Sequence, residues 1–242
     1  MGIVKAVVGD AVVTFLWVLS VSTLGPTTVK VMSNLPPEAQ VPAAQLGVSF
    51  VILATLLFTF TALCEAVGGA SFNPTGLAAF YAAGLGNDGL FSMALRFPAQ
   101  AAGAVGGALA IKELMPEEYK HMLGGPSLKV DLHTGALAEG VLTFVITLAV
   151  LWAVVKGPRN PLLKILIIST STLALVIAGG AYTGPSMNPA NAFGWAYVND
   201  RHNTWEQFYV YWICPFVGAV LAASVFRVLF PTPSATNKVK KA

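Results

Sequence analysis

Long apolar runs alternate with short polar segments along most of this chain. Six runs are each about 20 residues long, the length that a helix needs to cross a hydrocarbon core about 30 Å thick. They cover residues 6–24, 43–64, 91–111, 137–155, 161–179 and 208–230. The pattern predicts an all-α integral membrane protein with six transmembrane helices.

Two shorter apolar runs begin at Asn73 and Asn188, between the second and third spans and between the fifth and sixth. Each is only about half a membrane long. Glycine-rich segments precede them at residues 67–70 and 178–181. Because non-helical backbone at membrane depth must lie inside protein or line a water-filled path, we expect two re-entrant half-helices.

The two short runs carry matched motifs, Asn73-Pro74-Thr75 and Asn188-Pro189-Ala190. At the same distance beyond each asparagine the chain reads Gly-Ala-Val, beginning at Gly103 and at Gly218. This duplication predicts a single transmembrane domain, residues 1–242, built from two copies of one plan.

The copies would cover about residues 1–125 and 126–242, with three spans each. An odd number of spans means that the second copy enters the membrane in the opposite orientation, as an inverted repeat. Such repeats place the functional site near the bilayer midplane, where the two broken elements meet.

Asparagine followed by proline is a favourable start for a helix. The asparagine oxygen accepts a backbone N–H of the first turn, and a proline at the first helical position loses no hydrogen bond. We expect the side-chain NH₂ groups of Asn73 and Asn188 to face a pore as donors. Two helix starts that meet also concentrate positive potential, which repels cations.

Composition excludes several classes of protein. Hydrophobic residues make up 55% of the chain and charged residues only 10%, which is unlike a soluble domain. The net charge is +3, but the basic residues are not interleaved with aromatic residues as on a nucleic-acid-binding surface, so no nucleic-acid partner is expected. No nucleophile is paired with a histidine base, so we expect no enzyme and no cofactor. His121, His133 and His202 lack metal-ligand spacing, and Cys64 and Cys214 lie in apolar runs, so neither a metal site nor a disulfide is expected.

Basic residues in short loops indicate the orientation. They follow the fourth span and fill the tail of about residues 231–242, and these two segments lie on one side if the spans number six. The residues concerned are Lys156, Arg159, Lys164, Lys238, Lys240 and Lys241. We therefore expect both termini to be cytosolic.

The paired boxes and the six spans resemble the aquaporin, or major intrinsic protein, family over essentially the whole chain. Thr75 in the first box, the short N-terminus, the basic character and the lysine-rich tail resemble the plant small basic intrinsic proteins. The resemblance implies an aquaporin-like fold and a passive channel for water and small neutral solutes across the lipid bilayer. It also implies a homotetramer with one pore in each subunit.

The resemblance further implies a second constriction of four residues. By their places in the family pattern these are Leu53 or its neighbour Ile52, Val176, Pro185 and Asn191. Most members of the family have arginine where this chain has Asn191, and water-selective members usually have histidine where it has Val176. The ring is therefore expected to be less polar, with no fixed charge.

Asp10 and Glu139 are carboxylates inside the first span of each copy, where burial is costly and function is the default hypothesis. The resemblance implies that both accept hydrogen bonds from the re-entrant loops; a proton relay is the alternative. The Thr75 hydroxyl could bond a nearby carbonyl, narrow the pore or be merely tolerated. Arg96, near the start of the third span, could be a pore cation, but a basic side chain close to a helix end more often reaches the membrane interface, so a structural role is expected.

Two other functions remain open at this point. An ion-coupled or proton-coupled secondary transporter also uses inverted repeats and broken helices, but it needs a coupling group that faces the path. Only Asp10 and Glu139 are available for that role. A membrane organiser with a closed pore is the other alternative, supported by the altered constriction alone.

The tail carries Lys238 and Lys240, a Lys-x-Lys-x-x arrangement read by retrograde coat machinery on cytosolic tails. Together with the resemblance to the small basic intrinsic proteins, it indicates the endoplasmic reticulum membrane. The alternative is that these lysines are ordinary positive-inside charges.

Replacing both lysines, Lys238→Ala with Lys240→Ala, should let a tagged protein leave the endoplasmic reticulum for later membranes, because the retrieval motif is lost. Fluorescence microscopy against compartment markers measures this, with Lys156→Ala as a control that removes a cytosolic charge outside the motif. Continued confinement of the double variant would place retention elsewhere in the chain.

Overall fold

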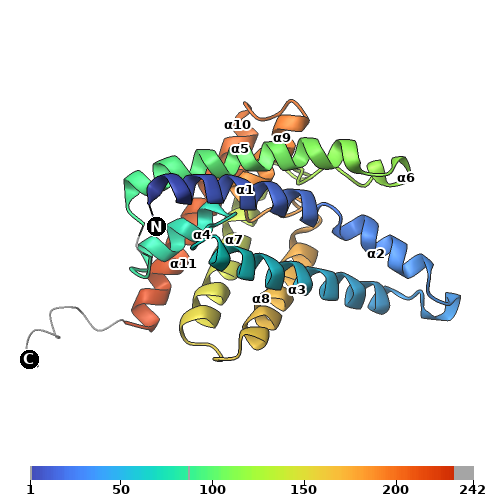
Figure 1. Cartoon of the computed structure of the whole chain (residues 1–242), viewed down its shortest axis with the longest axis horizontal. Helices are drawn as coiled ribbons and strands as arrows, with labels where there is room; N and C mark the ends of the chain where they lie inside the picture. The colour runs from blue at the N-terminus through green and yellow to red at the C-terminus, as the bar shows by residue number, and fades with distance from the viewer. Residues whose placement is uncertain (1, 87, 232–242) are drawn as a thin grey trace, which may run out of the picture.

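The computed structural model describes residues 2–86 and 88–231, and within these ranges the chain forms helices and no strands (Figure 1). In chain order the elements are α1 (Ile3–Val21), α2 (Leu24–Ser33), the 3₁₀ turn η1 (Pro37–Ala39), α3 (Pro42–Ala66), α4 (Pro74–Ala82), α5 (Leu90–Leu114), α6 (Glu117–Lys120), α7 (Leu132–Val155), α8 (Pro161–Gly179), α9 (Pro189–Val198), α10 (Trp205–Phe208), the π-helical turn η2 (Tyr209–Ile213) and α11 (Cys214–Leu229). The tail lysines Lys238 and Lys240 lie outside the described residues.

The described ranges contain the six long helical segments predicted from the apolar runs, which confirms the all-α membrane fold. Five are long and apolar enough to cross a membrane by length and composition: Ile3–Ser33, Pro42–Ala66, Leu132–Val155, Pro161–Gly179 and Trp205–Leu229. The sixth is α5, of 25 residues, which is the least apolar of the long helices. Its charged residues include Arg96.

Helix α2 was not predicted from the sequence, and neither were the short elements η1, α6 and α10. The helix restarts as α2 just after α1 and continues to Ser33, although the first apolar run ends at residue 24. Figure 1 shows α2 and the first turns of α3 extending together beyond the rest of the bundle. In the same view α1 begins and α11 ends at the same end of the molecule.

The two copies repeat one helix pair. In the first copy α1 packs along α5, and in the second α7 packs along α11. A Cβ atom on Gly103 would collide with the carbonyl oxygen of Ala11, and one on Gly218 with that of Gly140. The duplicated Gly-Ala-Val motifs therefore mark the closest crossing within each pair, where small residues allow backbones to touch.

The half-helices connect the two copies. The first-copy half-helix α4 packs on α11 of the second copy, and α9 packs on α5 of the first. A Cβ on Gly194 of α9 would lie 2.6 Å from the carbonyl oxygen of Ala104, so this crossing also depends on glycine. The half-helices also contact each other, which brings their N-termini together in the interior.

Alanine at either crossing glycine should destabilise the fold. Gly103→Ala and Gly218→Ala each force a methyl group against a backbone carbonyl, an overpacking cost of about 1–3 kcal/mol. We expect the midpoint of thermal unfolding of the purified protein in detergent to fall by roughly 3–10 °C.

Gly47 in α3 provides the matched control, because a Cβ there meets no atom within 4 Å. Gly47→Ala should leave the midpoint unchanged or raise it, since alanine is the better helix former. Midpoints of the two crossing variants equal to that of the parent protein would contradict the close-crossing account.

Candidate functional site

The two Asn-Pro motifs cap the half-helices. The Asn73 oxygen accepts from the backbone N–H of Thr75 at 3.0 Å. The Asn188 oxygen accepts from the N–H groups of Ala190 and Asn191 at 3.1 and 3.3 Å. A proline occupies the first helical position of each half-helix. The local chemistry of each motif thus fixes the position of its asparagine amide.

The asparagine NH₂ groups join the two loops. Asn73 Nδ2 donates to the carbonyl oxygen of Met187 at 3.1 Å, and Asn188 Nδ2 donates to that of Phe72 at 2.9 Å. Each amide therefore binds the carbonyl that immediately precedes the other asparagine. These two bonds between the loops were not predicted from the sequence. Since an amide nitrogen carries two hydrogens, one hydrogen on each remains available to a solute.

Thr75 supports the first cap. Its hydroxyl lies 2.7 Å from the Asn73 oxygen, to which it donates, and 3.4 Å from the Met187 carbonyl oxygen. The side chain is 2% exposed. The hydroxyl thus bonds nearby oxygens, and Thr75 also belongs to the lining of the cavity described below.

Glu139 holds the second loop. It accepts hydrogen bonds from the Thr183 hydroxyl at 2.8 Å and from the backbone N–H groups of Ser186 and Met187 at 2.9 and 3.0 Å. Met187 has a φ of 50°, a left-handed conformation that is unfavourable for a residue with a side chain. This conformation is stabilised because the Met187 N–H donates to Glu139 and the Met187 carbonyl oxygen accepts from Asn73.

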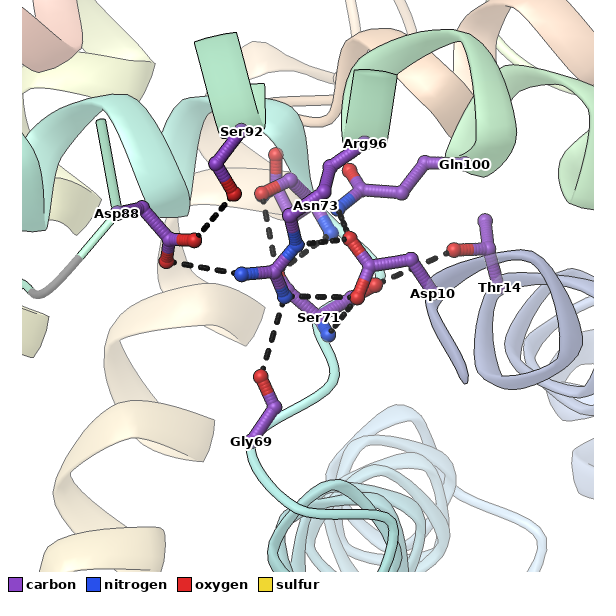
Figure 2. Close-up of polar contacts among 9 residues, drawn as sticks. All are labelled: Asp10, Thr14, Gly69, Ser71, Asn73, Asp88, Ser92, Arg96 and Gln100. Carbon is purple, nitrogen blue, oxygen red and sulfur yellow. Dashed lines mark hydrogen bonds and ion pairs between the residues drawn. The ribbon is translucent and has the colours of Figure 1, made fainter. Parts of the chain in front are cut away.

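Asp10 occupies the corresponding place in the first copy but has different partners (Figure 2). It accepts one backbone N–H of the loop, that of Ser71, at 2.8 Å. Its other bonds come from Gln100 at 2.6 Å and from Arg96, whose Nη2 lies 2.7 Å away. Asp10 is completely buried.

The contacts of Arg96 agree with the structural role expected of it, but its side chain is buried in the protein and does not reach out to the interface. The side chain is 3% exposed and forms an ion pair with Asp10, 86 positions away along the chain. It also pairs with Asp88 at 2.8 Å. Burial alone would raise the pKa of Asp88, but hydrogen bonds from Ser92 and Arg96 and the charge of Arg96 hold it below its usual value.

A cavity of about 600 Å³ runs between the two copies and includes both asparagines in its lining. Three constriction residues expected from the resemblance line it, namely Val176, Pro185 and Asn191. Of the two candidates on the second span, Leu53 lines the cavity and Ile52 is not among its lining residues. The Asn191 amide lies 3.4 Å from the Ser186 hydroxyl.

Most of the remaining lining is apolar and was not predicted from the sequence. Its members recur at helical spacing on one face of the long helices, which is the signal that could have identified them. They include Leu57 and Thr61 on α3, Ile146, Thr147, Val150 and Leu151 on α7, and Ile168, Thr172 and Leu173 on α8.

The lining carries no charge. Among the residues that the structure describes, no Asp, Glu, Lys, Arg or His lines the cavity, and Asp10 and Glu139 bond to the loops behind it. The same described ranges contain no group of three His, Cys, Asp or Glu residues that could hold a metal ion.

Comparison with known proteins gives concordant results. The family model described as "Major intrinsic protein" matches residues 1–226. Aquaporin SIP1-1 of Oryza sativa subsp. japonica is 70% identical over 242 residues, covering 99% of this chain and 98% of the relative. Aquaporin SIP1-1 of Arabidopsis thaliana is 51% identical over 242 residues, covering 100% and 99%.

A solved structure resembles this one in fold. The aquaglyceroporin from Plasmodium falciparum matches with a TM-score of 0.69 at 18% sequence identity, covering 95% of this chain and 98% of that one. The same architecture is thus formed by two very different sequences.

Proposed function

The chain belongs to the major intrinsic protein family, and we propose that water and small neutral solutes cross the membrane through the cavity between its two half-helices. A passive membrane channel for water is the function that the family match and the high identity to named aquaporins support. The residues that carry out conduction are inferred from the geometry of the cavity.

The observation that carries the proposal is the pair of oriented amide donors at the meeting point of α4 and α9. Asn73 and Asn188 are each fixed by the cap on one side and by the opposite carbonyl on the other. A solute that accepts a hydrogen bond finds two donors in fixed positions there. Because both helix N-termini also point to this place, their partial positive charges disfavour cations.

The uncharged lining weighs against a coupled transporter. Proton coupling in membrane transporters typically uses titratable side chains on the path. Asp10 and Glu139, the candidates for that role, use their oxygens to bind loop backbone and neighbouring side chains. A cavity of this size likewise gives the closed-pore organiser no support.

The proposed selectivity constriction consists of Leu53, Val176, Pro185 and Asn191. An arginine at such a ring supplies donors and an electrostatic barrier to cations. With Asn191 in that place, cation exclusion rests on the two helix N-termini, and the ring admits neutral solutes larger than water.

A homotetramer in the endoplasmic reticulum membrane, with both termini cytosolic, completes the proposal. The spans α3 and α8 are little covered by their own subunit, since only 11% and 17% of their most apolar windows are buried. Lipid or neighbouring subunits must cover these apolar faces. Within each subunit the two repeats form one domain, because each half-helix packs on a span of the other copy.

Asn188→Leu should strongly lower osmotic water permeability, because it removes one oriented donor and places an apolar group in the path. Stopped-flow shrinkage of proteoliposomes, normalised to protein content, measures this. Asn34→Leu is the control, as that amide bonds only to Lys30 at an exposed helix end. Equal permeability of Asn188→Leu and the parent protein would refute the shared pore.

Asn191→Arg should reduce the permeability of glycerol and urea relative to that of water, by narrowing the ring and adding a charge. Asn203→Arg places the same charge on the exposed loop after α9, outside the cavity lining, and should leave the ratio unchanged. An unchanged ratio for Asn191→Arg would mean that residue 191 does not form the constriction.

A further inference from the structure

The two copies hold their re-entrant loops by different chemistry. In the second copy Glu139 reaches two loop N–H groups and the Thr183 hydroxyl without help from a cation. In the first copy Asp10 is one methylene shorter and reaches a single loop N–H, that of Ser71. The first loop therefore needs another source of hydrogen bonds.

Arg96 supplies them (Figure 2). Its Nε and Nη2 bind the two oxygens of Asp10 at 2.8 and 2.7 Å, a fork that matches the shape of a carboxylate. Nη2 also donates to the carbonyl oxygen of Gly69 at 3.1 Å. One guanidinium thus joins a carboxylate on α1 to the backbone of the first loop.

The same guanidinium also reaches the chain beyond the half-helix. Nη1 donates to Asp88 at 2.8 Å, and Asp88 accepts in turn from the Ser92 hydroxyl. Gly69 precedes half-helix α4 and Asp88 follows it. Arg96, which belongs to α5, therefore contacts the chain on both sides of α4. A lysine has one nitrogen and could not make these bonds together.

A short chain of contacts leads from Arg96 to the pore. Asp10 binds the N–H of Ser71, and the Ser71 hydroxyl lies 3.3 Å from the backbone nitrogen of Asn73. The Asn73 amide in turn donates to Met187 across the cavity. A shift of the first loop would therefore move the donor that the proposed pore uses.

We propose that Arg96 is a positioning residue, which fixes half-helix α4 at both flanks and so sets the place of the Asn73 donor in the pore. The inference rests on the proposed channel function. It predicts that the shape of the guanidinium matters as well as its charge, and that a longer acid at position 10 makes Arg96 dispensable.

The first test is Arg96→Lys, which keeps the charge and loses the fork. Water permeability of proteoliposomes per protein molecule should fall about fivefold, the scale of losing one net hydrogen bond. The activation energy of water permeation should rise, because a displaced donor changes the path itself. Permeability and activation energy equal to those of the parent protein would overturn the proposal.

The second test is rescue. Arg96→Gln should lower permeability at least as much as Arg96→Lys does, and adding Asp10→Glu should restore at least about half of the loss. A glutamate at position 10 can reach a second loop N–H, as Glu139 does, and the shorter glutamine leaves it room. Failure of the longer acid to restore permeability would contradict the positioning role.

Arg227→Gln is the matched control. Arg227 also contacts α4, through an exposed bond to the Ala82 carbonyl at 3.3 Å, and its loss should leave permeability unchanged. A variant that merely loses folded molecules lowers permeability at constant activation energy, and that result for Arg96→Lys would count against the proposal.

If the Arg96 variants fail to reconstitute, Asp88→Ala removes the outer acceptor of Arg96 and should cause a smaller loss in the same direction. No effect of Asp88→Ala would then overturn the two-flank clamp. Failure of the channel function itself is distinguished by the parent protein, which would show no permeability above that of empty vesicles.

Discussion

Two crossed hydrogen bonds join the halves of this protein where its two re-entrant loops meet. Each asparagine amide donates to the carbonyl that precedes the other asparagine, at 3.1 and 2.9 Å. Lipid cannot satisfy the backbone of a loop at membrane depth, so the loops must satisfy each other and the helices around them. The caps, the scaffold carboxylates and the glycine crossings all serve to keep these two loops in register.

The duplicated plan is not symmetric in its chemistry. The second copy uses a glutamate that reaches the loop unaided, whereas the first uses an aspartate completed by Arg96 and Gln100. A buried ion pair costs desolvation and is retained only where its geometry is good, which the forked contact provides. The first half-helix thereby depends on α5, a dependence with no counterpart at Glu139.

Hydropathy and helix-cap chemistry are local, which is why the six spans, both half-helices and their capping asparagines could be predicted from the sequence. The glycine motifs could be recognised as a repeat, although their role at the crossings required the packed structure. The pairing of Arg96 with Asp10 could not be predicted, because Asp10 lies 86 positions away on another helix. Whether Leu53 or its neighbour Ile52 lines the cavity depends on the rotation of α3 about its axis, and that rotation is set by packing against the other helices.

Channel and coupled transport differ in what drives the flux, and this difference can be measured directly. Vesicles containing the purified protein would be shrunk by an osmotic gradient in the presence and absence of proton and sodium gradients, and compared with empty vesicles. A passive channel predicts faster shrinkage than empty vesicles, at a rate set by the osmotic gradient alone. Shrinkage no faster than in empty vesicles, or a rate that follows an ion gradient, would contradict it.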